Sequence, residues 1–194
     1  MLKLQARTTV TSQFVRGHTF PVDTPSLRVS EIPLHGIIRI QGGSESAQTR
    51  AIIESVLALN LPLPERSTQD KSKRLAWVGP NEWLVLCAVE EELGILNELT
   101  KALADQFSTV TLVSDSRVSF LVAGDVAADF VAKGCAIDLH ATAFPVGATV
   151  TTRFAGLPAM LLHRDTCEYV LYFDVSMAGF LIDWLSDASE EFDV

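Results

Sequence analysis

The feature that most constrains this chain is a pattern that occurs twice: a β-branched or apolar strand, one or two glycines, an acidic residue and then a helix. The pattern occupies residues 41–45 and recurs at residues 123–125. Strands that alternate with helices in this way favour an α+β fold. Two copies predict two related α+β lobes, because an array of short repeats would show a shorter period.

The first copy contains enough capping and helix-terminating residues to predict its helices and strands. Ser44 or Ser46 can cap a helix that runs to Leu59, and Leu61-Pro-Leu-Pro64 stops it because proline lacks an amide hydrogen. Residues 65–73 are expected to form a charged loop. The expected order is a strand at 36–42, this helix, strands at 74–78 and 82–89, a helix at 93–107 and a strand at 109–113. This β-α-β-β-α-β order is the split βαβ, or ferredoxin-like, arrangement.

The second copy also has four expected strands and two expected helices, in a different order. A strand at 118–123, a helix at 125–133, strands at 148–154, 158–163 and 168–174, and a last amphipathic helix at 176–191 are expected. We therefore predict an extended N-terminal arm at residues 1–33, a first lobe at 34–115 and a second lobe at 116–194. The lobes are expected to form one compact unit, and the arm is a modest indication of a partner.

Charge and cysteine content exclude several classes of function. The net charge of −9 opposes the phosphate backbone of nucleic acid. The one basic run, Lys71-Ser-Lys-Arg74, is expected to be solvated. The apolar runs are too short to cross a bilayer, and no secretory signal opens the chain, so a cytoplasmic protein is expected. The three cysteines, Cys87, Cys135 and Cys167, form no CxxC pair and are expected to be free thiols.

The candidate catalytic groups are few, and each has a simpler structural interpretation. Gly42-Gly43 and Gly124 precede helices, but neither matches a phosphate-binding motif and both adjoin acidic residues. Cys135, Asp138 and His140 lie close together, yet a Cys–His pair requires the imidazole within hydrogen-bond reach of the sulfur. We favour a buried thiol, with Asp138 and His140 hydrogen-bonding the loop backbone. No catalytic, cofactor-binding or metal-binding residue is predicted.

Three segments, taken together, resemble the gamma subunits of heterotetrameric sarcosine oxidases. They are Leu75-Ala-Trp-Val-Gly-Pro-Asn-Glu-Trp-Leu84, Ser114-Asp-Ser-Arg117, and Lys133-Gly-Cys-Ala-Ile-Asp-Leu-His140 with the following Ala143-Phe-Pro-Val-Gly147. Their order and spacing match from about Pro33 to the C-terminus. One departure is Ala141-Thr142, where that family would have a Pro-Arg-like pair.

This resemblance implies an accessory subunit in an oxidoreductase complex. Such a complex demethylates sarcosine oxidatively to glycine and hydrogen peroxide and passes the one-carbon unit to tetrahydrofolate. The resemblance places FAD, FMN, NAD and tetrahydrofolate in the partner subunits and none in this chain. It also implies a shortened aminomethyltransferase folate-binding fold that contacts the larger alpha subunit most directly, with beta and delta subunits completing the heterotetramer.

The residues expected at the partner interface come from one loop and one tryptophan. Residues 139–146 are predicted to protrude, with Phe144-Pro145 filling a pocket of the partner. Trp83 is a core anchor or an interface anchor. The predicted interface set is Trp83, Cys135, Asp138, His140, Phe144 and Pro145.

Two alternatives from other functional classes remain open. Lys133-Gly-Cys135 is similar to the signature of stand-alone folate-binding proteins linked to iron–sulfur repair, although the residues that follow differ. A small-molecule-binding protein of the same superfamily is therefore the first alternative. An independent thiol enzyme that uses Cys135 is the second.

Overall fold

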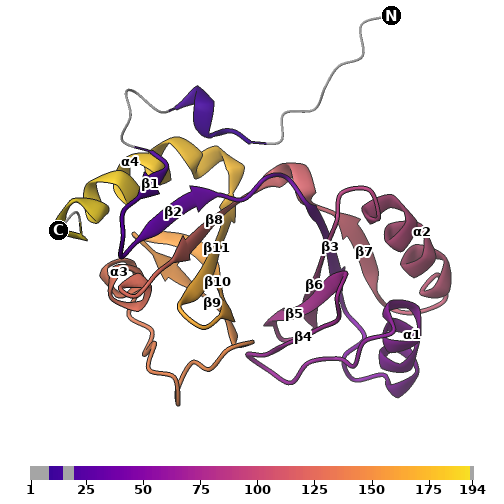
Figure 1. Cartoon of the computed structure of the whole chain (residues 1–194). Coiled ribbons are helices and arrows are strands. Elements are labelled where there is room, and N and C mark those ends of the chain that lie inside the picture. The colour runs from indigo at the N-terminus through magenta and orange to yellow at the C-terminus, as the bar shows by residue number, and fades with distance from the viewer. Residues whose placement is uncertain (1–8, 15–19, 193–194) are drawn as a thin grey trace, which may run out of the picture.

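The computed structural model describes residues 9–14 and 20–192, whose strands form two antiparallel sheets (Figure 1). Each sheet carries two helices on the face directed away from the other sheet, and the two inner faces pack together. This is the α+β architecture with two lobes that the sequence predicts.

The five-stranded sheet is built from one continuous stretch of the chain. Its elements are β3 (Gly36–Gln41), α1 (Ala47–Leu57), β4 (Ser67–Gln69), β5 (Lys73–Gly79), β6 (Glu82–Cys87), α2 (Glu92–Ala102) and β7 (Thr109–Leu112). The strand order is β4-β5-β6-β3-β7, so that β5, β6, β3 and β7 follow the ferredoxin-like order. Ser46 caps α1, because its side chain accepts a hydrogen bond from the Thr49 amide at 3.1 Å.

The six-stranded sheet joins two separate parts of the chain. Its elements are β1 (Val22–Asp23), β2 (Arg28–Glu31), β8 (Arg117–Ala123), α3 (Ala127–Gly134), β9 (Thr149–Phe154), β10 (Leu157–Asp165), β11 (Glu168–Asp174) and α4 (Ala178–Ser189). Four short 3-10 helices accompany the two lobes: η1 (Thr11–Gln13), η2 (Ser114–Ser116), η3 (Val175–Met177) and η4 (Glu190–Phe192). The strand order is β1-β2-β8-β11-β10-β9.

Leaving out the short edge strand β1, the two sheets have the same strand order. The order β7-β3-β6-β5-β4 in one corresponds to β2-β8-β11-β10-β9 in the other. In the five-stranded sheet the edge strand β7, which pairs with β3, follows α2 along the chain. In the second sheet the equivalent place beside β8 is filled by β2, which comes from the N-terminal segment.

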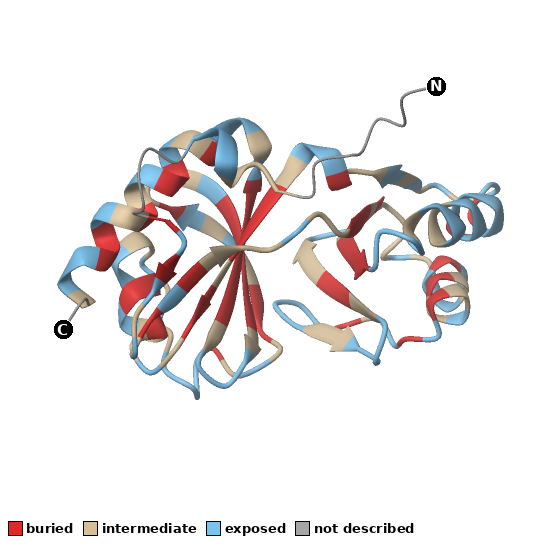
Figure 2. Cartoon of the chain, turned by 45° about the horizontal axis from the view of Figure 1, so that its top comes forward, coloured by how far each residue is buried: buried red, intermediate tan, exposed pale blue. Residues whose placement is uncertain are grey.

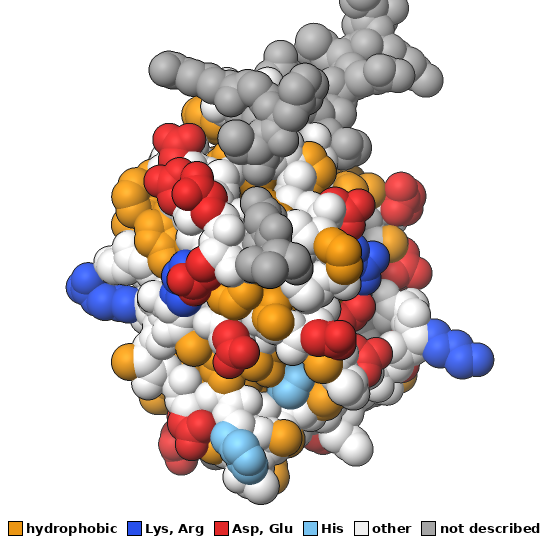
Figure 3. All heavy atoms as spheres, turned by 60° about the vertical axis from the view of Figure 1, so that its left-hand side comes forward, with side chains coloured by type: hydrophobic (Ala, Val, Ile, Leu, Met, Phe, Trp, Pro, Cys, Tyr) orange, Lys and Arg blue, Asp and Glu red, His pale blue; other side chains and the backbone are white. Residues whose placement is uncertain are grey.

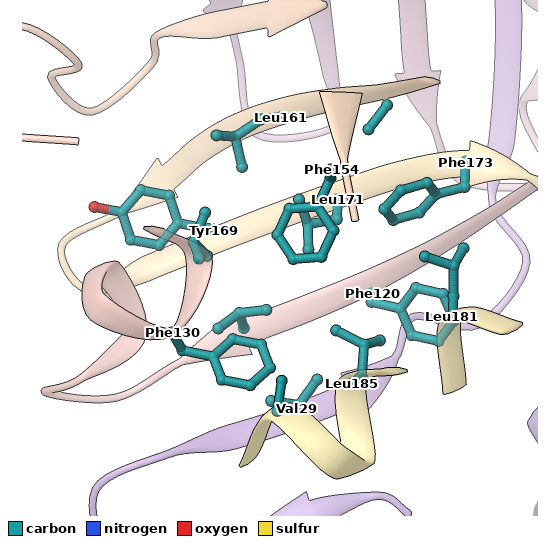
Figure 4. Close-up of a cluster of buried hydrophobic side chains, with 14 of the residues drawn as sticks. Val29, Phe120, Phe130, Phe154, Leu161, Tyr169, Leu171, Phe173, Leu181 and Leu185 are labelled. Carbon is teal, nitrogen blue, oxygen red and sulfur yellow. The ribbon is translucent and has the colours of Figure 1, made fainter. Parts of the chain in front are cut away.

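This arrangement corrects the predicted N-terminal arm. Residues 1–8 and 15–19 lie outside the described part, but Val22, Leu27 and Val29 are buried in the core of the six-stranded lobe. Val29 pairs with Val122, and Figure 4 shows its side chain within the buried cluster. Residues 22–31 are therefore an integral part of a lobe. The placement of the lobe boundaries at residues 34, 115 and 116 stays a prediction.

The glycines of the repeated pattern have the same structural role in both lobes. Gly42 has φ +93°, and a Cβ there would lie 2.6 Å from the Phe107 carbonyl oxygen, just before β7. Gly124 has φ +125°, and a Cβ there would collide with the Ser26 carbonyl oxygen, just before β2. Each glycine thus lets the segment that leads into the neighbouring strand approach the backbone closely.

Two smaller differences from the predicted elements concern the first lobe. The segment 65–73, expected as a loop, contains the three-residue edge strand β4, and the helix expected to reach residue 107 ends at Ala102. Figure 2 shows that buried residues concentrate on the strands and on the inner sides of the helices. Edge strands with exposed polar side chains lack this burial signal, which explains why β4 is invisible to hydrophobic patterning.

The two sheets are joined by a thin apolar layer and by their edges. Ile37, Leu84 and Leu86 on one inner face pack against Leu162 and Tyr172 on the other. At the edge, Arg66 and Ala148 form a β-bridge, and the Thr149 hydroxyl donates to the Trp77 carbonyl at 2.7 Å. The two lobes therefore contact each other through both the faces and the edges of their sheets.

Candidate functional site

The irregular segment between α3 and β9, residues 135–148, is the candidate site because it holds five of the six predicted interface residues. Figure 1 shows this loop leaving α3 and ending beside the five-stranded sheet. The Ser67 amide donates to the Gly147 carbonyl at 2.8 Å, and Gly147 has φ +86°. The end of the loop is therefore fixed to the other lobe.

Cys135 and His140 do not form a catalytic pair. The Cys135 thiol donates to the Val131 carbonyl at 3.5 Å, and burial raises the pKa of this thiol. The His140 Nδ1 instead lies 2.8 Å from the Thr142 hydroxyl. A thiol that stays protonated and has no base beside it lacks the activation that a nucleophilic cysteine requires.

Asp138 and His140 stabilise the conformation of the loop. The His140 amide donates to the Asp138 carboxylate at 3.0 Å, and the amides of Ala143 and Phe144 donate to the His140 carbonyl at 2.9 and 2.8 Å. Such local bonds replace those that regular secondary structure would supply. The Thr142 amide also donates to the His140 Nδ1 at 3.4 Å, so both side chains hydrogen-bond the loop backbone.

Phe144 does not protrude, which corrects the prediction that it fills a pocket of a partner. Its side chain is 5% exposed and stacks on His163, with ring centroids 6.0 Å apart and an interplanar angle of 6°. His163 Nδ1 donates to the Phe144 carbonyl at 2.7 Å and its ring stacks in turn on Tyr169. Phe144 therefore anchors the loop to its own lobe and has little surface for another protein.

Trp83 is likewise a core residue. It is 4% exposed and lies under the helices of the five-stranded lobe with Ile38, Ile40 and Leu99. Of its two expected roles, core anchor and interface anchor, the structure assigns the first. The loop residues that remain accessible include Asp138, His140 and Val146, while Cys135 and Pro145 are half-buried.

The other sites considered from the sequence are structural as well. Main chain approaches Gly42 and Gly124 closely, and the hollow beside Gly42 and Gly43 is lined by Glu45 and by neutral residues, with no Lys or Arg that would hold a phosphate. Within residues 9–14 and 20–192, no group of three or more His, Cys, Asp or Glu side chains could hold a metal ion. The described helices include none that is long and apolar enough to span a bilayer. Cys87, Cys135 and Cys167 are free thiols, as expected.

One cluster escaped the sequence interpretation. Arg74 lies on β5, in agreement with the strand predicted at 74–78, but it lines a cavity with Arg164 and Tyr172 where the basic run was expected to be solvated. The alternation of side chains along a strand could have indicated this, since Arg74 and buried Ala76 share one face of β5. The nearness of Arg164 depends on packing between sheets, which the sequence does not show.

Comparison with known proteins gives consistent matches over most of the chain. Residues 41–191 match the model of the sarcosine oxidase, gamma subunit family. The sarcosine oxidase subunit gamma of Corynebacterium sp. (strain P-1) is 32% identical over 116 residues, which are 60% of this chain and 56% of that protein. The chain thus matches little more than half the length of this relative. The subunit gamma of an Arthrobacter species is 28% identical over 144 residues, covering 73% of this chain and 70% of its own.

Solved structures show the same fold. A chain of the heterotetrameric sarcosine oxidase from Corynebacterium sp. U-96 superimposes with a TM-score of 0.83 at 22% identity, over 91% of this chain and 90% of that one. The glycine cleavage system aminomethyltransferase T from Bartonella henselae superimposes with a TM-score of 0.60 at 13% identity, over 82% of this chain and 45% of that one. The second match confirms the predicted shortened aminomethyltransferase-like fold. Because the family model covers well over half of its residues, the chain belongs to the sarcosine oxidase gamma subunit family.

Proposed function

We propose that this chain is a non-catalytic structural gamma subunit of a heterotetrameric sarcosine oxidase. The complex would convert sarcosine to glycine and hydrogen peroxide and transfer the one-carbon unit to tetrahydrofolate. FAD, FMN, NAD and tetrahydrofolate would bind to the alpha, beta and delta subunits, with the alpha subunit as the direct partner, in the cytoplasm. The observation that carries the proposal is the family match over residues 41–191.

The chemistry of the loop supports a structural role. Cys135 donates its proton to a backbone carbonyl, and His140 and Asp138 are engaged within the loop. A group held in this way stabilises a conformation and is not poised to attack a substrate. Replacing Cys135 by alanine is therefore expected to leave turnover of the assembled complex within a few-fold of the wild-type value.

The accessible part of the same loop is the proposed contact with the alpha subunit. Its base is fixed by Phe144 and by the bond to Gly147, so binding would cost little ordering entropy. Val146 is 50% exposed and offers an apolar contact on the same loop. Figure 3 shows acidic and hydrophobic side chains intermixed over one side of the molecule.

Co-purification of the tagged chain with the large subunits tests this function. A yellow complex that releases peroxide with sarcosine is expected. Val146→Asp should reduce the recovery of the complex at least tenfold, whereas Leu93→Asp, at a 58% exposed leucine on α2, should not. A colourless chain that purifies alone and binds tetrahydrofolate would contradict the proposal and favour a folate-binding protein.

A further inference from the structure

A second feature of the molecule lies apart from the loop, at one end of the layer between the two sheets. An open cavity of about 500 Å³ is lined there by the β4–β5 turn, by β5, and by β10 and β11. Its walls bring together Arg74, Arg164 and Tyr172. None of these residues takes part in the proposed function.

The cavity is cationic in a chain that is strongly anionic. Lys71, Lys73, Arg74 and Arg164 line it, against the carboxylates of Asp70 and Asp165. The whole chain carries a net charge of −9. A local excess of positive charge with this background attracts an anion.

Two of the charges are already paired inside the wall. Lys73 Nζ lies 3.1 Å from the Asp70 carboxylate, and Arg164 Nη2 lies 2.8 Å from Glu168. The Asp165 carboxylate accepts a hydrogen bond from the Thr166 amide at 2.8 Å. These contacts hold the rim of the cavity in place.

Arg74 differs from its neighbours because its hydrogen bonds go to neutral groups. Its Nη1 donates to the Ser67 hydroxyl at 2.8 Å and its Nη2 donates to the Gln69 side-chain carbonyl. Burial, together with the like charge of Arg164, lowers the pKa of the Arg74 guanidinium, although Tyr172 and Asp165 act in the opposite direction. Arg164 has a carboxylate partner in Glu168 whereas the half-buried Arg74 has none, so an anion beside Arg74 and within reach of Arg164 would be stabilised.

Tyr172 supplies a neutral donor at the floor of the cavity. Its side chain is 5% exposed, and burial raises the pKa of the phenol well above its usual range. The hydroxyl therefore keeps its proton throughout the physiological range. His35 packs edge-on against the tyrosine ring, with centroids 5.7 Å apart, and fixes its position.

We propose that this cavity binds a small dianion, a phosphate or a dicarboxylate, between the guanidiniums of Arg74 and Arg164. The planar fork of arginine matches the geometry of both oxyanions, and paired charged hydrogen bonds are stronger than neutral ones. The site stands independently of the sarcosine oxidase assignment, because it depends only on groups of this chain.

Calorimetric titration of the full-length chain with inorganic phosphate and, separately, with succinate tests the site. Saturable one-to-one binding of at least one of them is expected at physiological ionic strength, and the tighter of the two identifies phosphate or carboxylate as the preferred group. Arg74→Gln and Arg164→Gln should each weaken binding at least tenfold. Arg153→Gln, at an exposed arginine on β9, should bind as the wild type does.

The variants also separate binding from folding. Arg164 is 39% exposed in its side chain, so Arg164→Gln should unfold at the same temperature as the wild type without ligand. The absence of saturable binding to either probe would overturn the proposal. Equal affinity in Arg153→Gln, Arg74→Gln and Arg164→Gln would also overturn it, since the anion would then bind elsewhere.

Discussion

The two lobes share one strand order but differ in how the chain builds them. The five-stranded lobe is formed by the continuous stretch from Gly36 to Leu112. The six-stranded lobe needs β2, whose Val29 pairs with Val122 across nearly half of the chain. The same sheet order is therefore completed by β7 at the C-terminal end of the first lobe and by β2, which precedes β8 in the chain, in the second lobe.

Some residues that look peripheral in the sequence complete the core of a lobe. Val29 and Phe144 look peripheral in sequence, one in an arm and the other in a loop, yet both are buried in the core of the six-stranded lobe.

The largest effect is expected when the borrowed strand is disrupted. Val29→Asp places a carboxylate at a fully buried position without a cationic partner, so the free energy of unfolding should fall by about 4 kcal/mol or more. Val110→Asp, on the equivalent strand β7, alters a half-buried residue and should cost clearly less. Chemical denaturation of both variants measures the difference. Equal losses would contradict the view that β2 is the more deeply integrated strand.

Removal of the loop anchor should come next. Phe144→Ala leaves a cavity beside His163 and should destabilise the isolated chain by roughly 3 kcal/mol. Thermal unfolding of the chain without its partners is the relevant measurement. An unchanged midpoint would mean that the ring contributes to contacts outside this chain, as the sequence interpretation held.

The repeated glycines should show equal sensitivity in the two lobes. Gly42→Ala and Gly124→Ala each force a Cβ onto a neighbouring carbonyl at a positive φ, at a cost of about 2 to 3 kcal/mol. Gly94→Ala, in the first turn of α2 where a Cβ would meet nothing within 4 Å, is the control and should stabilise by up to about 1 kcal/mol. If only one of the two glycines proved sensitive, their equivalence would be lost.

A smaller effect is expected where the two lobes meet. Thr149→Val removes the hydroxyl that donates to the Trp77 carbonyl and should cost about 1 to 2 kcal/mol. Thr152→Val, at a half-buried threonine on the same strand, controls for the change in shape. Denaturation curves that coincide for both variants would show that this bond does not couple the lobes.

The sequence predicted local structure better than long-range contacts. The helix capped by Ser46 and most strands were identified because capping and periodicity are encoded within a few residues. The strands β1 and β2 are two and four residues long, lie between prolines, and acquire their stability from partners far along the chain. The burial of Phe144 and the meeting of Arg74 with Arg164 have the same origin, since each depends on packing that no local pattern records.

Hydrogen exchange of the intact chain tests the integration of β2 most directly. If β2 is part of the six-stranded lobe, the amides of residues 28–31 that bond to β8 should be protected as strongly as those of residues 117–123. Exchange of the first group within seconds, with β8 still protected, would contradict the account. The N-terminal segment would then be an arm, and the two lobes would differ in more than connectivity.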